Sequence, residues 1–508
     1  MIARKSALII TTQVANALLG YVALFFIARY MTPWEYGVVG FAYGLVSLFM
    51  IFGDLGFNHA HIKKVSEGKN LGKCIGTFLA TKIGLTGLMT SAIIGAVLFW
   101  KIVMGRGFET PTHELAVYIM LGYSILHVLS RSFISTFQAK KEIAKAQIPL
   151  FFETLFRVAV TIYVALAGFG ALALAFTYVI GDIAFFLSSF FLLRRYPIKK
   201  PSKSYLKDYT VFAFPMAFVV TSSLIMSNID KVLIQLFWSA EDVGYYFAAF
   251  NLSRFINVFT LAVGALLFPT FSVLHMNKNI IGIRKLTFQS ERYLSMIVFP
   301  MVIGIVILAD PAVHILLSNR YYPAVPILQI LPFFALFAAL ERPYQSQFIG
   351  MNRPKLARNR IFIMVFLNVV LNILLIPKDI QMLGIDLAGM GATGAAIATV
   401  VSYAAGLVYS RVMAWKLTKI MGNPRILFHA VASGIMATIL YVLLYRLNMV
   451  ESIARWYHLI GFAILGFGIY ICVLYLLREF SKEDFHFFID TLNIKKMFRY
   501  IYEEIRGK

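Results

Sequence analysis

The sequence has little charge and little cysteine, and each shortage excludes a class of protein. Only 14% of the 508 residues are charged and 60% are hydrophobic, whereas soluble domains are roughly 25% charged. Two cysteines, Cys74 and Cys472, are too few for a disulfide framework or a clustered metal site. Acidic residues are scarce too, at 24 against 47 Lys and Arg. Because the excess positive charge lies mostly in short loops between apolar runs, we expect no nucleic-acid partner.

Long apolar runs are abundant. A transmembrane helix needs about 20 mostly apolar residues, and runs of that kind predict an all-α polytopic membrane protein with about 14 transmembrane helices. The predicted spans cover roughly residues 7–30, 36–57, 75–100, 113–137, 147–167, 170–193, 210–236, 243–274, 291–317, 324–347, 360–376, 388–413, 425–446 and 457–479.

The loops between these spans differ strongly in their basic charge. About 34 of the 47 Lys and Arg lie in the two termini and every second loop, and about 7 lie in the remaining loops. Since cytoplasmic loops carry the excess of Lys and Arg, we expect a cell (plasma or inner) membrane protein with both termini cytoplasmic. The outer loops are short and no Walker A pattern occurs, so we expect a transporter rather than an enzyme.

A basic connection at residues 194–208 divides the predicted spans into two halves of six. We therefore predict an N-terminal six-helix bundle at 1–200 and a C-terminal six-helix bundle at 201–420. Two additional transmembrane helices follow at 421–480. A capping-box pattern then opens an aromatic, basic stretch, which we interpret as a cytoplasmic amphipathic tail at 481–508.

Two short stretches recur in both halves. Near the ends of the fourth and tenth spans, matched residues share an offset of 211: Arg131, Ser135 and Phe137 with Arg342, Ser346 and Phe348. Glu35 and Gly37 open the second span as Asp242 and Gly244 open the eighth. Halves of six spans that both begin and end inside are parallel repeats, which predicts two bundles around a central cavity, an arrangement typical of transporters.

Six basic residues lie inside apolar spans: Lys82, Arg131, Arg157, Lys231, Arg254 and Arg342. A charge at the bilayer centre costs about 2.5–3.5 kcal/mol, so such a residue usually faces a water-filled cavity or a partner. The cationic excess predicts an anionic ligand, and the planar fork of arginine suits phosphate oxygens.

We predict two sets of site residues from these charges. The predicted substrate-binding residues are Arg254, Arg157, Arg131, Lys82 and Arg29. The predicted ion-coupling or gate residues are the carboxylates Asp182, Asp54, Asp230 and Glu153. Asp182 is the best candidate for binding a coupling Na⁺ or proton because it lies near mid-depth. We predict no metal and no other cofactor.

Several of these residues also have a simpler interpretation. Glu153 and Arg157 are spaced i,i+4 with the acid first, which favours a neutralising pair on one helix. Arg29 fits an interfacial anchor, and Lys231 and Arg342 fit side chains that extend to the membrane interface. Arg254 is the hardest to explain this way, because it lies deep in a predicted span that offers it no acid.

Five short motifs resemble the Wzx-type polysaccharide flippases. They are Arg29 to Gly37 (RYMTPWEYG), Gly53 to Gly56 (GDLG), Asp230 to Ile234 (DKVLI), Val243 to Tyr246 (VGYY) and Gly350 to Pro354 (GMNRP). Their order and spacing extend the resemblance over essentially the whole chain. Met31 departs from it, since the family usually has leucine there.

The resemblance implies the polysaccharide-transport branch of the multidrug/oligosaccharidyl-lipid/polysaccharide (MOP) exporter superfamily. Such proteins move polyprenyl-linked oligosaccharides from the cytoplasmic to the outer leaflet by alternating access between two helical bundles. The expected partners are lipid-linked oligosaccharide, membrane lipids and glycan polymerase or glycosyltransferase machinery.

Three alternatives stay open at this point. An ion-coupled drug or cation exporter of the same superfamily would favour an acid-lined cavity. A membrane glycosyltransferase or polymerase would need a sizeable outer loop with catalytic residues. A scaffold protein would leave the charges within its spans unexplained.

Overall fold

A computed structural model describes residues 2–480 except 104, 106, 381–384, 421, 450–452 and 454. The side chains of residues 2–7, 10, 258, 259, 261–266, 268, 269, 380 and 385 are also outside the description. The predicted amphipathic tail at 481–508 lies outside the described residues.

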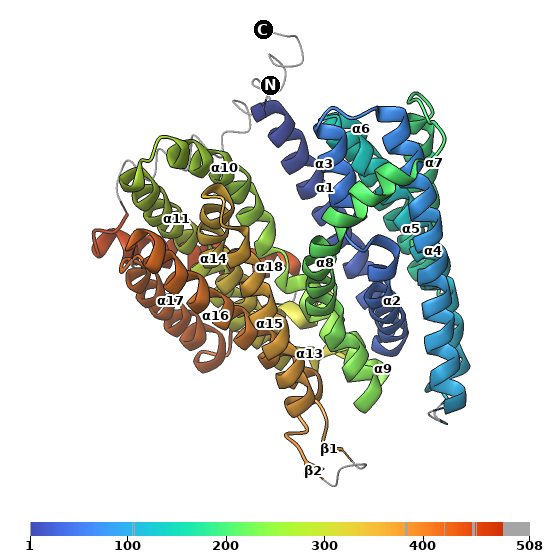
Figure 1. The fold of residues 1–508 in the computed structure, drawn as a ribbon. Helices are drawn as coiled ribbons and strands as arrows, with labels where there is room; N and C mark the ends of the chain where they lie inside the picture. Colours follow the sequence, from blue (N-terminus) through green and yellow to red (C-terminus); the bar gives the residue numbers. More distant parts are fainter. Residues whose placement is uncertain are drawn as a thin grey trace. The chain divides into compact units, whose positions relative to one another are not determined.

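Helices make up nearly all of the described chain (Figure 1). They are α1 (Ile2–Tyr30), α2 (Pro33–Asp54), α3 (Phe57–Ser66), α4 (Leu71–Leu98), α5 (Pro111–Ala139), α6 (Ile143–Leu166), α7 (Ala171–Leu193), α8 (Lys203–Phe237), α9 (Ala240–Ser253), α10 (Ile256–Met276), α11 (Ile280–Ile307), α12 (Ala309–Ala312), α13 (Ala324–Ile330), α14 (Pro332–Gly350), α15 (Pro354–Leu375), α16 (Gly391–Thr418), α17 (Ile426–Tyr441) and α18 (Trp456–Leu476).

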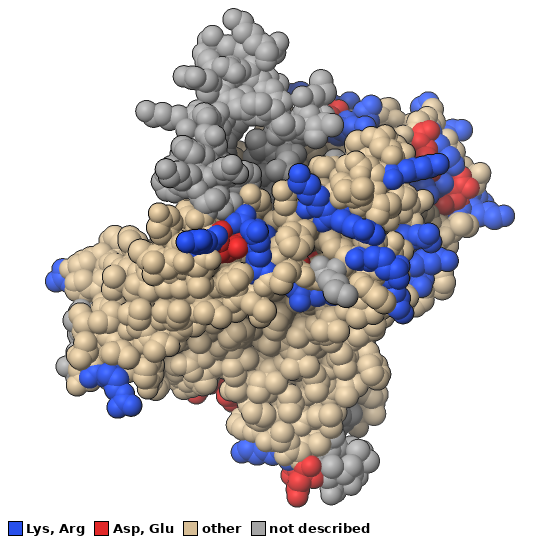
Figure 2. Space-filling model, turned by 90° about the vertical axis from the view of Figure 1, so that its left-hand side faces the viewer, with Lys and Arg blue, Asp and Glu red and all other residues tan. Residues whose placement is uncertain are grey.

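The predicted all-α membrane class is confirmed. Among the described residues, 13 helices are long and apolar enough to cross a membrane. The predicted eighth span, 243–274, corresponds to α9 and α10, which are separated by a turn at Arg254 and Phe255. One small hairpin pairs two-residue strands, β1 (Asp379–Ile380) and β2 (Ile385–Asp386). On the face drawn in Figure 2, Lys and Arg side chains gather in patches and leave wide areas without charged side chains.

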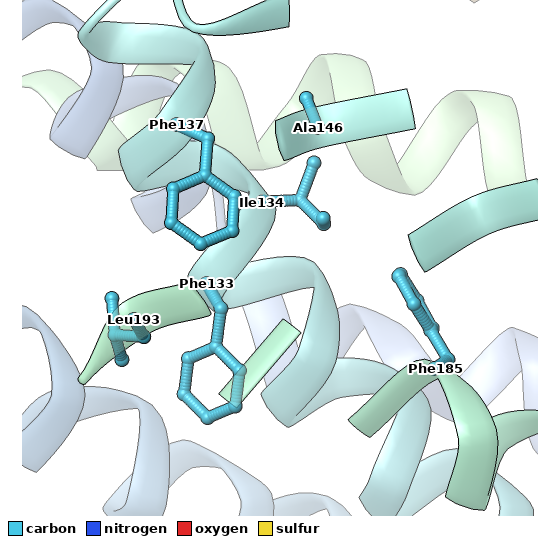
Figure 3. Packing of buried hydrophobic residues seen from close by; sticks show 6 residues of the cluster. All are labelled: Phe133, Ile134, Phe137, Ala146, Phe185 and Leu193. Atoms are coloured by element: carbon cyan, nitrogen blue, oxygen red, sulfur yellow. The ribbon is translucent and has the colours of Figure 1, made fainter. Parts of the chain in front are cut away.

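One compact unit, here called the N-terminal unit, comprises Thr11–Ala248 and Val365–Ala395. Within it, α2 packs against α4, α5, α7 and α8, and α7 packs against α5 and α6. Figure 3 shows one part of its core, where aromatic and aliphatic side chains of α5, α6 and α7 interlock. These side chains are Phe133, Ile134, Phe137, Ala146, Phe185 and Leu193.

The second compact unit, here called the C-terminal unit, comprises Met1–Ile10, Ala249–Met364 and Ala396–Lys508. In its described part, α14 packs against α10 and α11, and α17 packs against both α11 and α18. Buried Glu479, just after α18, accepts a hydrogen bond of 2.5 Å from Arg292 Nε on α11 and lies 3.5 Å from Arg425 Nη1. The main segment of the N-terminal unit ends at Ala248, whereas the first bundle was predicted to end at residue 200. The two-bundle division remains a prediction.

The N-terminal ends of α2 and α9 have the same local construction. Thr32 and Glu35 form a capping box, in which Glu35 N donates to Thr32 Oγ1 at 3.2 Å and Thr32 N donates to Glu35 Oε2 at 2.7 Å. Before α9, Ser239 Oγ donates to Asp242 Oδ2 at 2.6 Å, and Asp242 N donates back to Ser239 Oγ at 3.3 Å. Such caps satisfy backbone groups that a helix start leaves free.

Two glycines allow these two helix starts to touch. A Cβ on Gly37 would lie 1.6 Å from the carbonyl oxygen of Ala240, and a Cβ on Gly244 would lie 2.0 Å from that of Pro33. The contact is reciprocal, because residues 33 and 37 correspond to 240 and 244 in the repeat. Glycine is required at both positions for the backbones to approach this closely.

Candidate functional site

Arg131 is an accessible cation in the C-terminal part of α5, where most of the other side chains are buried or half-buried. Residues 119–139 of α5 are all described, and Arg131 is the one among them with an exposed side chain. The helix is covered by α2, α4, α6 and α7. Asp54, Tyr123 and Asp182 interact electrostatically with Arg131, and no described carboxylate forms an ion pair with it within 4.0 Å. Its guanidinium is therefore partly balanced by distant acids and remains open to a ligand.

Arg157 is paired within its own helix. Its Nε donates to Glu153 Oε1 at 2.7 Å, which is the i,i+4 ion pair that the spacing predicts. The guanidinium also lies over the ring of Tyr178, 5.3 Å from its centroid. Its side chain is 23% exposed, so one edge remains accessible while Glu153 neutralises its charge.

Lys82 is a predicted substrate-binding residue on α4, and its contacts in the structure are internal. The residue is fully buried, and its Nζ donates to Gly53 O at 2.5 Å and to Asp54 Oδ1 at 3.3 Å. Asp54 Oδ1 also accepts from Asn58 N, at 3.0 Å, at the start of α3. These contacts satisfy Lys82 and Asp54 at the turn between α2 and α3. A buried ammonium needs such internal partners, which is why this cation is not free for a ligand.

Asp182 is fully buried on α7 and has one described partner. His127 Nδ1 of α5 lies 3.0 Å from Asp182 Oδ1, whereas Asp182 Oδ2 is buried without a hydrogen-bond partner among the described residues. The side chain of His127 is 29% exposed. Sequence reasoning missed His127. The available signal was its position one helical turn before Arg131 on the same face of α5.

Three tyrosines connect these charged groups. The ring centroids of Tyr43, Tyr123 and Tyr178 lie 5.8–5.9 Å from one another, and Tyr123 lies 5.3 Å from the His127 ring. Lys231 extends its ammonium from α8 over Tyr43, at 5.7 Å. The N-terminal unit thus contains a continuous cluster of aromatic and charged side chains contributed by α2, α5, α6, α7 and α8.

Asp230 belongs to a separate buried group in the same unit. Its Oδ2 accepts from Tyr246 OH on α9 and its Oδ1 accepts from Asn372 Nδ2 on α15, each at 2.5 Å. Asn372 Nδ2 also donates to Asn368 Oδ1, at 3.2 Å. Asp230 therefore links three helices, and its predicted gating or coupling role remains a prediction.

The last two predicted ligand residues, Arg29 and Arg254, are both exposed. Arg29 lies in the last turn of α1, where an interfacial anchor would lie. Arg254 belongs to the C-terminal unit, at the turn between α9 and α10, with its guanidinium 5.6 Å from the Phe250 ring centroid. No described carboxylate lies within ion-pair distance of Arg254. Arg254 and Arg131 belong to different compact units.

Arg342, the repeat counterpart of Arg131, lies on α14. Its Nη1 donates to Gln345 Oε1 at 3.2 Å, while its Nε is buried without a described partner. The adjacent Glu341 is held by Arg360 and by Ser410 Oγ, so it does not neutralise Arg342 by direct contact. The repeat thus places a partly accessible arginine in each unit.

Comparison with solved structures shows that the chain shares its fold with known multi-helix membrane proteins. The chain is similar to the lipid II flippase MurJ in an inward closed conformation, with a TM-score of 0.73 and 16% identity, over 92% of this chain and 99% of that one. It is also similar to an inward-facing multidrug resistance MATE transporter of the MOP superfamily, with a TM-score of 0.63 and 16% identity, over 80% of this chain and 96% of that one.

The family follows from the sequence. The family model described as "Polysaccharide biosynthesis protein" matches residues 26–326, more than half of the chain, and the chain belongs to that family. A relative from Haloferax volcanii, named probable low-salt glycan biosynthesis flippase Agl15, is 24% identical over 412 residues, covering 80% of this chain and 82% of its own. The resemblance to polysaccharide flippases is confirmed.

Proposed function

We propose that the protein is a flippase that moves a polyprenyl-(pyro)phosphate-linked oligosaccharide from the cytoplasmic to the outer leaflet for glycan biosynthesis. Family membership, the flippase named among its relatives and the MurJ-like fold support this function. The observation that carries it is the exposed side chain of Arg131, the one exposed residue between 119 and 139 of α5. A cation that forms no ion pair with a described carboxylate is suited to an anionic headgroup.

The chemistry required of the protein is binding and movement, with no bond made or broken. Arg131 supplies a planar fork for phosphate oxygens, and Arg157 supplies a second, partly neutralised one. Arg254, in the C-terminal unit, remains a predicted substrate-binding residue. The polyprenyl tail stays in lipid because its transfer to water is unfavourable. Alternating access carries the headgroup across.

The cellular setting is part of the same proposal. The protein lies in the cell membrane with both termini cytoplasmic, supported by the excess of Lys and Arg in alternate loops. The membrane glycosyltransferases that assemble the lipid-linked glycan, or the polymerase that extends it, are its partners. It has no catalytic activity of its own. The coupling ion is a proton or sodium.

The test uses proteoliposomes that contain a lipid-linked oligosaccharide with a labelled headgroup. Transbilayer movement is read as the fraction of label accessible to an impermeant sugar oxidant. We expect Arg131→Gln to abolish movement and Arg131→Lys to restore only part of it, because lysine cannot bind phosphate bidentately.

The matched control is Arg194→Gln, which removes an exposed arginine at the end of α7, outside the cluster. It should retain wild-type movement. Full movement by Arg131→Gln would remove Arg131 from the site, and no movement by the wild-type protein would contradict the flippase function.

A further inference from the structure

The contact between His127 and Asp182 links two helices by a titratable pair. His127 Nδ1 lies 3.0 Å from Asp182 Oδ1. With Nδ1 donating to the carboxylate, Nε2 is the ring nitrogen left to accept a proton. The histidine is 29% exposed and the aspartate is fully buried, so the imidazole is the more accessible member of the pair.

Asp182 is incompletely compensated in this position. Its Oδ2 is buried and has no hydrogen-bond partner among the described residues. A buried carboxylate oxygen without a donor is costly. Positive charge on the adjacent imidazole relieves that cost, because His127 is the one described group that donates to this carboxylate.

Among the charged groups around this pair, Arg131 is one that forms no ion pair with a described carboxylate. The titratable and charged groups near the pair are Tyr123 and Arg131 on α5, Glu153 and Arg157 on α6, Tyr178 on α7, and Tyr43 and Asp54 on α2. Lys231 of α8 lies farther along the cluster, over Tyr43, and its Nζ donates to the Ser227 carbonyl at 2.9 Å. Glu153 and Arg157 neutralise each other, and Asp54 is bound by Lys82. Arg131 remains, one turn from His127 on the same face of α5 and within electrostatic reach of Asp182.

We propose that His127 and Asp182 form a proton-binding site that controls the affinity of Arg131 for the anionic headgroup. Without the proton, the negative charge of Asp182 acts on Arg131 and opposes the headgroup. With the proton on His127, the pair is neutral overall and the field of Arg131 is available to phosphate. Because such coupling is reciprocal, headgroup binding takes up a proton from water, and headgroup release returns it.

This inference rests on the proposed function, since it takes Arg131 as a ligand of the phosphate. It adds His127 as a positioning and charge-controlling residue that does not touch the substrate. A histidine suits this task because its ordinary pKa lies within the physiological range. A nitrogen base beside a carboxylate also favours a proton over sodium, which prefers sets of oxygen ligands.

The first experiment measures binding of a defined probe, farnesyl pyrophosphate, to the purified full-length protein by titration calorimetry. Measurements in two non-phosphate buffers of different ionisation enthalpy give the number of protons taken up. We expect the wild-type affinity to fall by roughly tenfold between pH 5.5 and 8, a typical size for coupling between two sites. His127→Gln keeps an amide donor toward Asp182, and should flatten this dependence and reduce the proton uptake.

His59→Gln is the matched control, since it removes an exposed histidine on α3, outside the pair. It should behave as wild type, and the proton uptake of His127→Gln gives the contribution of the probe itself. A second readout needs no ligand. The ring signal of His127, assigned by its absence in His127→Gln, should titrate in wild type and shift its midpoint in Asp182→Asn.

The outcomes separate this inference from the proposed function. Equal proton uptake by wild type and His127→Gln overturns the inference and leaves the flippase function standing. Unchanged probe affinity in Arg131→Gln overturns both the inference and the role of Arg131. Affinity that follows sodium concentration rather than pH overturns the assignment to a proton. If Asp182→Asn fails to fold, a His127 signal that does not titrate in wild type still overturns the proposal.

Discussion

A cation inside a membrane protein is either matched by partners of its own or left for a ligand. Lys82 and Arg131 represent these two cases within one unit. Lys82 is fully buried and bound by Asp54 and the Gly53 carbonyl, whereas Arg131 is exposed and has only electrostatic neighbours. Their apolar sequence surroundings are alike, so sequence predicts that both are unusual. Only the packing of α2 against α4 shows which of the two is matched.

The two residues should therefore fail in different ways when replaced. Lys82→Met leaves the partly buried Asp54 with one partner fewer, and removing one member of a fully buried pair costs about 3–5 kcal/mol, which is an upper bound here. We expect a lowered unfolding temperature in detergent for Lys82→Met. Arg131→Gln should unfold at the wild-type temperature and lose transport. A wild-type unfolding temperature in Lys82→Met would show that the ion pair does not support the α2–α3 turn.

His61 gives a second prediction at this scale. On α3, outside the candidate membrane spans, it is fully buried, with Nδ1 2.9 Å from Tyr209 OH and Nε2 3.0 Å from Thr136 Oγ1. Burial lowers the pKa of His61 from 6.5 to about 3. The folded state therefore binds fewer protons than the unfolded state, and stability is lost as pH falls below 6.5.

The expected loss from His61 at pH 5 is about 2 kcal/mol, and it continues to grow until about pH 3. Unfolding temperatures measured between pH 5 and 8 should fall on the acid side in wild type and change less in His61→Gln. An identical acid dependence in the two proteins would assign the effect to other groups.

Among the helices, the starts of α2 and α9 show how far sequence reasoning extends. Glu35 and Gly37 were matched with Asp242 and Gly244 as members of a repeat. The structure shows that these matched segments contact each other. Gly37 packs against Ala240, and Gly244 packs against Pro33, the residue that corresponds to Ala240 in the repeat. A sequence match shows that two segments correspond in a repeat, but it does not show that they lie close together. The break between α9 and α10 was also hidden, because residues 243–274 are continuously apolar enough to predict one span.

The glycine contact can be tested by adding one methyl group. In Gly37→Ala the new Cβ would lie 1.6 Å from the Ala240 carbonyl oxygen, so α2 and α9 must move apart. We expect a lowered unfolding temperature and reduced transport. Gly84→Ala on α4 is the matched control, because the methyl group added there would meet no atom of another element within 4 Å. Wild-type transport and stability in Gly37→Ala would contradict the close packing of these helices.

For the whole molecule, composition and loop charges were sufficient to predict the membrane class, and short motifs were sufficient to predict the family resemblance. They could not predict where the two compact units divide or which buried charges pair between different helices, because these depend on contacts between segments distant in sequence. The contact of Asp230 with Asn372 joins residues 142 positions apart. The orientation in the membrane follows from the loop charges and is open to direct measurement.

The predicted orientation places Gly107 outside the cell and Lys200 inside. Both residues are exposed. In a background with Cys74 and Cys472 replaced by serine, Gly107→Cys should react with an impermeant maleimide added to intact cells. Lys200→Cys should react only after permeabilisation. The reverse pattern would invert the proposed direction of transport.

The central claim is that the protein binds a membrane lipid by its phosphate-linked headgroup and moves it across the bilayer. The most direct measurement compares two labelled lipids in one set of wild-type proteoliposomes: a polyprenyl-pyrophosphate oligosaccharide and a neutral glycolipid with the same sugars. We predict that the protein accelerates transbilayer movement of the phosphate-linked lipid and leaves the neutral one at the protein-free rate. Equal acceleration of both lipids, or of neither, would contradict the account.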